Sequence, residues 1–389
     1  MKENWQYKKL GEVGKIITGN TPSTKNSENY SSEDFCFIKP SDIDLNGITY
    51  INNSEFHVSK KAFENSRKLP ISSVLITCIG IIGKVAILQI PAICNQQINA
   101  IIPSEDISSK FIAYSILGIR TYLNKIANAP VVPIINKKVF SEIKIPVPPL
   151  SEQERIVAEL DLLSGVIEKQ KQQLKELDTL AQSIFYSMFG SIDENRQNYK
   201  IETLNDIFFL ITDGTHQTPK YTDDSVNGYK FLSAKDVVSG KINWNNIKYI
   251  PEYLHLELSK RLKPQRGDIL LCKNGTTGIC ALVETDEIFD IYVSLALLRT
   301  NKDYNKKYLV FAINNPSTKQ QFDDSIKGIG VPNLHLKEIK KTKIIVPPLD
   351  LQNEFAVKIE KIEKQKEAIN KSIEETQKLF DYTMDKYFG

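Results

Sequence analysis

The sequence predicts an α+β fold with two repeated globular domains of mixed α and β structure, joined by two long helices that form a coiled coil. Three observations predict it: segments that recur after about 190 residues, a Pro-Pro-Leu motif that occurs twice, and apolar residues spaced alternately four and three apart after each motif. The domains are expected at residues 1–149 and 191–348, and the helices at 150–190 and 349–389.

The repeat runs through the whole chain, which indicates a duplication. Each copy closes on a phenylalanine and a glycine, Phe189-Gly190 and Phe388-Gly389. The matching segments are Lys9–Gly19 with Thr203–Asp213, Phe37–Ile43 with Phe231–Val237, Gly80–Gly83 with Gly275–Gly278, and Ile145–Gln153 with Ile344–Gln352. The two halves are therefore expected to share one fold.

Short β-branched runs bounded by Gly, Pro or Asn predict strands inside each domain. These runs are Val74–Thr77, Val85–Leu88 and Ile98–Ile102 in the first half, and Ile269–Cys272, Ile279–Val283 and Ile291–Leu298 in the second. A helical stretch is expected between these strands and each Pro-Pro-Leu motif, at Ser109–Ala127 and at Lys306–Phe322.

The two long helices carry the clearest periodicity. Spacing that averages 3.5 residues keeps one stripe of a helix facing a partner. Ser151 and Asp350 are suitable N-caps. The expected seam residues are Ile156, Leu160, Leu163, Ile167, Leu174 and Leu177 in the first helix, and Phe355, Ile359, Ile362, Ile369, Ile373 and Phe380 in the second.

A solitary helix of about 38 residues with an apolar stripe is unstable in water, so the two helices are expected to pack on each other. The alternative is that each helix lies on its own domain. Each long helix would be about 57 Å long, the length of about 17 base pairs of DNA. The spacing by itself leaves parallel and antiparallel pairing open.

Composition places the chain among soluble globular proteins, with 41% hydrophobic and 25% charged residues. An odd count of five cysteines and a polar start at Met1–Leu10 indicate a cytoplasmic protein. Val74–Cys94 is the one long apolar stretch, but Gly80, Gly83 and Pro91 would interrupt a membrane helix there. No membrane association is expected.

Charge permits nucleic-acid binding without proving it. Residues 1–149 hold 17 basic and 12 acidic side chains, residues 191–348 hold 22 and 19, and both helical segments are net acidic. So modest an excess would bind phosphate only if it were gathered on one face.

Motifs for chemistry are absent from the sequence. Gly80–Lys84 has the wrong spacing for a phosphate-binding loop, and the four histidines belong to no metal signature. No glycine-rich cofactor turn is found. The expectation is a chain without catalytic residues, metal or bound cofactor, although a folded active site can escape a motif search.

Candidate DNA-binding residues come from loops, and each has an ordinary structural alternative. The two glycine turns suit positive φ angles, and their bare backbone could also approach phosphates. Asn95-Gln96-Gln97 could cap a turn or hydrogen-bond to adenine edges. Single basic residues are more often solvated surface charges. The candidates are Lys39, Ser41, Arg67, Lys68, Lys84, Asn95, Gln96, Gln97, Lys235, Arg261, Lys263, Lys273, Asn274, Thr276 and Thr277.

A duplicated unit that ends in Pro-Pro-Leu-x-x-Gln and continues into a coiled-coil helix resembles the specificity subunits of type I restriction-modification systems. The resemblance covers the whole chain. Its most specific parts are Ile145–Ile156 with Ile344–Phe355, Gly80–Ile87, and Pro332-Asn333-Leu334. Asn353 stands in place of Glu154, and Val293-Ser294-Leu295 in place of Asn95-Gln96-Gln97, which implies that the two domains read different sequences.

The resemblance implies a non-catalytic subunit that binds a split target in double-stranded DNA, one half-site per target-recognition domain. The helices would form an antiparallel pair that sets the unread spacer. Two methyltransferase subunits would dock and supply S-adenosylmethionine, and restriction subunits would join the complex. The alternatives are a scaffold that binds only proteins and an enzyme hidden in one globular half.

Overall fold

The computed structural model describes residues 5–127, 132–195, 197–238, 240–326 and 332–389. The chain forms two compact units: unit 1 comprises residues 1–172 and 369–389, and unit 2 comprises residues 173–368. Each unit therefore combines one globular domain with one half of each long helix.

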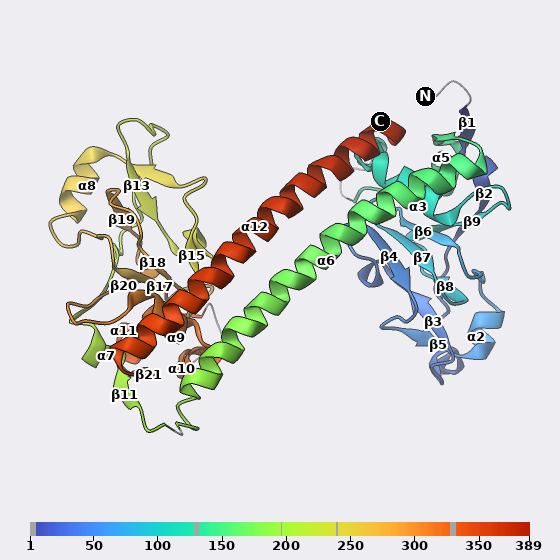
Figure 1. Ribbon diagram of the computed structural model, residues 1–389. Helices are drawn as coiled ribbons and strands as arrows, with labels where there is room; N and C mark the ends of the chain where they lie inside the picture. The colour runs from blue at the N-terminus through green and yellow to red at the C-terminus, as the bar shows by residue number, and fades with distance from the viewer. Residues whose placement is uncertain (1–4, 128–131, 196, 239, 327–331) are drawn as a thin grey trace. The chain divides into compact units, whose positions relative to one another are not determined.

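Unit 1 is built on a five-stranded sheet in the order β2 (Gly14–Thr18), β9 (Ile98–Pro103), β6 (Val74–Thr77), β7 (Val85–Leu88) and β4 (Ile48–Ile51) (Figure 1). Its strands are antiparallel except for β4 with β7. The other strands are β5 (His57–Val58), β3 (Phe35–Ile38) and β8 (Ala92–Cys94) in a second sheet, and β1 (Gln6–Lys9) paired with β10 (Lys144–Val147). The helices are α1 (Leu10–Val13), α2 (Lys60–Glu64), α3 (Ser109–Gly118), α4 (Arg120–Ile126) and α5 (Lys137–Glu142), with 3-10 turns η1 (Ser27–Tyr30) and η2 (Pro40–Asp42).

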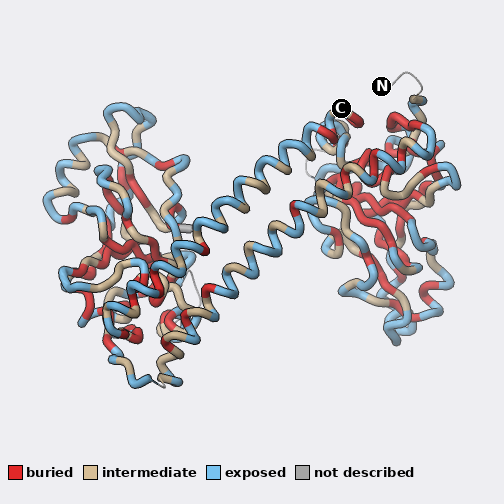
Figure 2. The backbone as a smooth tube through the Cα atoms, viewed as in Figure 1, coloured by how far each residue is buried: buried red, intermediate tan, exposed pale blue. Residues whose placement is uncertain are grey.

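The central strands β6 and β7 of the main sheet in unit 1 are buried along their whole length (Figure 2). Their side chains alternate between the two faces of the sheet. Val74 and Val85 pack in one cluster with Ile112 of α3. Leu75 and Ala86 point the other way and pack with residues of β3 and β8. Because both faces are covered, the strands read as continuous apolar runs.

Unit 2 repeats this arrangement. Its main sheet has the order β12 (Leu210–Asp213), β20 (Leu295–Arg299), β17 (Ile269–Cys272) and β18 (Cys280–Leu282). The other strands are β16 (Lys248–Ile250), β13 (Tyr229–Leu232) and β19 (Phe289–Ile291) in one sheet, β14 (Val237–Val238) with β15 (Lys241–Ile242), and β11 (Lys200–Thr203) with β21 (Lys343–Val346). The helices are α7 (Leu204–Ile207), α8 (Glu252–Leu258), α9 (Lys306–Asn314), α10 (Pro316–Ser325) and α11 (Leu336–Lys341), with 3-10 turn η3 (Ala234–Asp236).

The predicted strands form and both predicted helical stretches are helical, but each stretch holds two helices and one predicted strand spans parts of two strands. Ser109–Ala127 is two helices that break at Ile119. Lys306–Phe322 is also two helices, because Asn315 caps the second and Pro316 has no N–H to continue the first. Ile291–Leu298 is the end of β19 and most of β20, separated by a turn.

The apolar stretch Val74–Cys94 forms strands β6, β7 and β8. Within the residues that the structure describes, no helix combines the length and apolarity needed to cross a membrane.

The long helices are α6 (Leu150–Phe189) and α12 (Leu349–Phe388). Both begin directly after the second proline, so Ser151 and Asp350 lie in the first turn and the N-cap prediction was wrong. The spacing of the motif, which is the same in both copies, instead positions a glutamine. Gln153 is buried, donates to the Pro148 carbonyl at 3.0 Å and accepts from the Ser108 N–H at 3.0 Å.

Gln352 makes the same two contacts in unit 2, with the Pro347 carbonyl at 2.8 Å and the Asn305 N–H at 3.0 Å. In both units the glutamine thus joins the Pro-Pro-Leu hinge to the N-cap of a domain helix, α3 or α9. This explains why Pro-Pro-Leu-x-x-Gln occurs as one motif.

The helix pair is antiparallel in each unit. In unit 1, Ile156 and Leu160 near the start of α6 pack with Tyr387 near the end of α12. In unit 2, Phe185 and Phe189 at the end of α6 contact Phe355 at the start of α12 with ring centroids 5.5 Å apart.

None of the twelve predicted seam residues is exposed. Five of them are buried and seven are half-buried. The buried residues are Ile156, Leu160, Ile167, Phe355 and Ile362; the half-buried ones are Leu163, Leu174, Leu177, Ile359, Ile369, Ile373 and Phe380.

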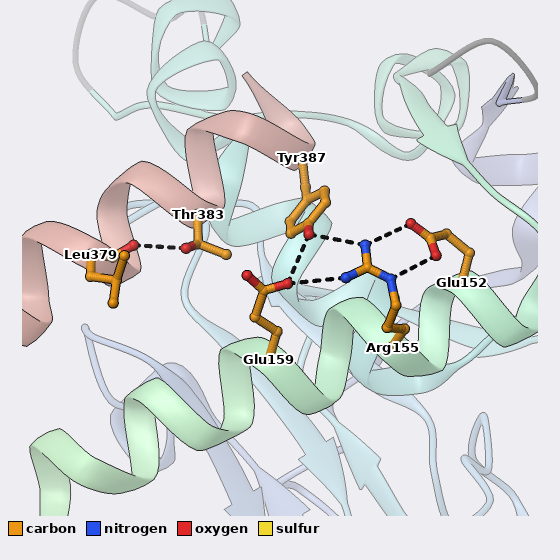
Figure 3. A network of polar contacts seen from close by, with 6 residues as sticks. All are labelled: Glu152, Arg155, Glu159, Leu379, Thr383 and Tyr387. Atoms are coloured by element: carbon orange, nitrogen blue, oxygen red, sulfur yellow. Dashed lines mark hydrogen bonds and ion pairs between the residues drawn. The ribbon is translucent and has the colours of Figure 1, made fainter. Parts of the chain in front are cut away.

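Polar contacts fix the register of the pair in unit 1 (Figure 3). The Arg155 guanidinium donates to Glu152 at 2.8 Å and to the Tyr387 hydroxyl at 3.0 Å. That hydroxyl in turn donates to Glu159 at 2.8 Å. One aromatic side chain of α12 is therefore held by two charged residues of α6.

Candidate nucleic-acid interface

The glycine turn of unit 1 is held mainly by backbone atoms, with the Thr77 hydroxyl donating to the Ile81 carbonyl inside it. Gly80 and Gly83 both have φ of +79°, which favours glycine. The Gly80 N–H donates to the Pro133 carbonyl at 3.0 Å, and the Gly83 N–H donates to the Thr77 carbonyl at 2.9 Å. The turn is thereby fixed between β6, β7 and the segment before α5.

Unit 2 holds its glycine turn by the equivalent bonds. Gly275 and Gly278 have φ of +76° and +82°. The Gly275 N–H donates to the Pro332 carbonyl at 3.2 Å, and the Gly278 N–H donates to the Cys272 carbonyl at 2.9 Å. The prediction that both glycine pairs form turns with positive φ is confirmed, and Pro332-Asn333-Leu334 is the segment on which the second turn rests.

A second loop, Asn95-Gln96-Gln97, lies beside the first turn, because the Cys78 N–H donates to the Gln97 carbonyl at 2.8 Å. Asn95 is buried and caps this loop: its Oδ1 accepts from the Gln97 N–H at 3.1 Å. Gln96 is exposed, and its Oε1 accepts from the Thr21 hydroxyl at 2.6 Å. Asn95 thus caps a turn, the structural alternative for this loop, while Gln96 presents its amide at the surface.

The corresponding loop of unit 2 is Tyr292-Val293-Ser294, one residue earlier than the sequence comparison placed it. The Lys273 N–H donates to the Ser294 carbonyl at 2.9 Å, the bond that Cys78 makes to Gln97. The Tyr292 N–H donates to the Leu232 carbonyl at 2.8 Å, as Asn95 does to Ile38 at 3.0 Å. Val293 therefore occupies the position of Gln96.

An arginine occupies the same place in both units. Arg67 NH1 donates to the carbonyl of Thr18, the last residue of β2, at 2.7 Å. Arg261 NH2 donates to the carbonyl of Asp213, the last residue of β12, at 2.7 Å. Both arginines are exposed residues beside the loops just described, so their free N–H groups face solvent.

Beneath the loops the two units differ in charge. In unit 1 the Thr18 hydroxyl donates to Asn99 at 2.6 Å, and Asn99 lies 3.3 Å from the Cys78 sulfur. Burial raises the pKa of the Cys78 thiol to about 12, so this set is neutral.

In unit 2 the same positions hold a buried ion pair, with Lys273 Nζ 2.7 Å from Asp213 Oδ2. Burial would raise the pKa of Asp213, but the hydrogen bond and charge of Lys273, helped by His216, lower it. Lys273 therefore neutralises an internal carboxylate beneath the loop.

Lys84 also holds an internal position. Its Nζ donates to the Pro40 carbonyl at 2.8 Å and the Ile43 carbonyl at 2.6 Å, around η2. In unit 2 the Cys272 thiol lies 3.6 Å from the equivalent carbonyls of Ala234 and Val237. One pair of carbonyls is thus satisfied by two different side chains in the two copies.

The remaining candidates are spread over the same loops. Lys39 is half-buried with its ammonium 2.9 Å from the centroid of the Phe56 ring, and Asn274 is half-buried with an Oδ1 that has no partner among the described atoms. Thr277 is buried. The exposed candidates are Ser41, Lys68, Lys235, Lys263 and Thr276. Sequence reasoning missed Thr21, whose only signal was its position two residues after the matched segment Lys9–Gly19.

Within the described ranges, no group of three or more His, Cys, Asp or Glu residues is arranged to hold a metal ion. All five cysteines are unpaired and buried.

Comparison with known proteins places both halves of the chain in one family. The model described as "Type I restriction modification DNA specificity domain" matches residues 2–179 and again residues 196–377. The chain therefore belongs to the DNA-specificity family of type I restriction-modification systems, as the motif resemblance predicted.

Two relatives align over most of their length. The MjaIX specificity subunit of Methanocaldococcus jannaschii is 25% identical over 91% of this chain and 85% of its own. The EcoKI specificity subunit of Escherichia coli strain K12 is 24% identical over 96% and 85%.

The fold matches solved structures over nearly the whole chain. The S subunit from M. genitalium has a TM-score of 0.55 at 15% identity, covering 99% of this chain and 96% of that one. A chain solved in work on complex assembly of the type I R-M system has a TM-score of 0.59 at 18% identity, covering 99% and 98%. The predicted fold class is confirmed.

Proposed function

We propose that this type I specificity subunit reads a DNA target in two parts, one half-site per domain, and that it catalyses no reaction itself. One observation carries the proposal: the same backbone framework occurs in both units and presents different side chains at its surface. A duplicated frame with unequal side chains is what a reader of two unrelated half-sites needs.

The chemistry of the presented residues supports different readings. The Gln96 amide can donate and accept together, as the N6 and N7 atoms of adenine require. Val293, at the equivalent position, is apolar and half-buried, and suits a thymine methyl group. Arg67 and Arg261 supply exposed guanidinium groups for phosphate or guanine beside each loop.

Docking of two methyltransferase subunits follows from the same duplication. Each unit carries a globular domain with an antiparallel helix pair, so one partner surface would find two equivalent sites. The methyltransferase would supply S-adenosylmethionine and methylate an adenine that is flipped out of the duplex. Restriction subunits would complete the complex. The cofactor would then belong to the partner and not to this chain.

The test is co-expression with the neighbouring methyltransferase, followed by base-resolution mapping of methyladenine. The expected result is a methylated motif in two parts with a fixed gap. Gln96→Ala should change or abolish reading of one half-site only. Gln217→Ala is the matched control, because it removes an exposed glutamine from the other unit. A complex that assembles but methylates nothing would favour the protein scaffold instead.

The helix pair can be tested as the spacer. Inserting four residues after Gln170 adds about one helical turn. We expect an altered gap or a failed assembly with both half-sites retained. A changed half-site with the original gap would refute this role.

A further inference from the structure

A basic groove runs beside the edge strand β2 of unit 1. It encloses about 590 Å³ between residues 15–18 of β2 and the side chains of Arg67, Lys68 and Lys137. Lys15, on β2 itself, is the fourth cation of this groove, and no carboxylate lines it.

The four charges are available to a ligand. Lys15, Arg67, Lys68 and Lys137 are all exposed, and none forms an ion pair with a carboxylate in the described ranges. Arg67 is also oriented, since one of its nitrogens is held by the Thr18 carbonyl. Four unpaired cations around one hollow would repel one another unless an anionic partner bound there.

Unit 2 lacks three of these four charges at the matching positions. The hydrogen-bond frame relates Thr18 to Asp213 and Ile135 to Leu334, which fixes the correspondence of residues nearby. By that correspondence Arg67 is retained as Arg261, whereas the three lysines are replaced by leucines. The replacements are Leu210 for Lys15, Leu262 for Lys68 and Leu336 for Lys137.

The leucines pack inward in unit 2. Leu262 is buried in the cluster that Leu210 also contacts, and Leu336 packs on the other core cluster. Three positions that are solvated cations in one copy are therefore part of the apolar packing in the other.

We propose that the groove of unit 1 binds the phosphate backbone of DNA, and that the first domain thus carries a sequence-independent electrostatic site that the second lacks. This inference rests on the proposed function and adds to it that the two domains contribute unequally to phosphate binding. No amide side chain lines the groove, and lysine contacts with phosphates position a protein without reading sequence.

The test compares two triple variants of the full chain in complex with its methyltransferase. Lys15→Gln/Lys68→Gln/Lys137→Gln removes the groove charges. Lys25→Gln/Lys125→Gln/Lys169→Gln removes three exposed charges elsewhere in unit 1 and serves as the control. Binding is measured from 50 to 200 mM NaCl on two duplexes, one with the mapped target and one with its half-sites scrambled.

Each lost phosphate contact lowers the slope of log affinity against log salt by about 0.9, so the groove variant should lose about 2.7. Its affinity deficit relative to the wild type should be about 40-fold larger at 50 mM than at 200 mM. The deficit should be equal on both duplexes, with the methylated sequence unchanged and the control variant close to wild type.

Three results would overturn the inference and leave the proposed function standing: a wild-type slope in the groove variant, an equal loss in the control, or a loss confined to the target duplex. A wild-type complex that binds neither duplex would overturn both.

Discussion

The buried ion pair of unit 2 permits a quantitative test of the duplicated frame. Lys273 and Asp213 lie 2.7 Å apart with side chains only 8% and 10% exposed. Lys273→Met removes one charge and leaves the buried Asp213 carboxylate with only the exposed His216 as a possible cationic partner. Breaking such a pair costs about 3–5 kcal/mol, mostly for the charge left behind.

The uncharged residues at the matching positions of unit 1 can replace this ion pair. Asp213→Thr, Lys273→Cys and Ala296→Asn together place the neutral set of Thr18, Cys78 and Asn99 into unit 2. Because replacing both charges leaves none unpaired, the triple variant should return to within about 2 kcal/mol of the wild type.

Calorimetry measures both variants. Each kcal/mol shifts the melting temperature of a domain of this size by about 2–4 °C, so Lys273→Met should melt about 6–20 °C lower. Asp213 has a lowered pKa, so its stabilising contribution is present above its ordinary value of 3.8 and is lost as pH falls through the folded value. The wild type should therefore lose melting temperature below about pH 4 faster than the triple variant. A Lys273→Met transition within 2 °C of the wild type would refute this reasoning.

Three further changes test other contacts. Gly278→Ala should destabilise more than Gly275→Ala, because both have positive φ, worth about 1–2 kcal/mol each, but only at Gly278 would the new Cβ meet another atom, 3.0 Å away; equal losses in denaturant titrations would contradict this. Leu174→Asp should lower the stability of the helix pair by about 1–3 kcal/mol, whereas Leu162→Asp, on the exposed side of the same helix, should be close to neutral. Equal melting temperatures for the two variants would refute the predicted seam. Tyr387→Phe removes two hydrogen bonds to charged residues and should lower the free energy of unfolding by about 1–2 kcal/mol. An unchanged melting temperature would contradict this.

Much of the fold could be predicted because its signals are local. The seam of α6 and α12 is a periodic pattern, and β6 and β7 are apolar runs between glycines and prolines. The pairing of β1 with β10 was missed, because Gln6 meets Val147 across the whole domain and neither strand alternates clearly. Long-range pairing leaves little trace in a short sequence window.

The candidate site was less predictable because side-chain partners lie far apart in the chain. Nothing near Lys273 indicates that Asp213, 60 residues earlier, will neutralise it. Asn95 and Gln96 are adjacent and chemically alike, yet one caps the loop and the other lies at the surface. The equivalence of Gln96 with Val293 was displaced by one residue, and only the backbone hydrogen bonds fixed it.

The loops that carry Gln96 and Val293 are fixed largely by main-chain N–H and C=O groups, which every residue but proline supplies in full. The shape of such a loop is therefore nearly independent of the side chain at its tip. A substitution there can change what the surface offers to a ligand while costing the fold little. New specificities could then arise by single changes, or be moved between the two copies by exchanging one residue, without redesign of the domain beneath.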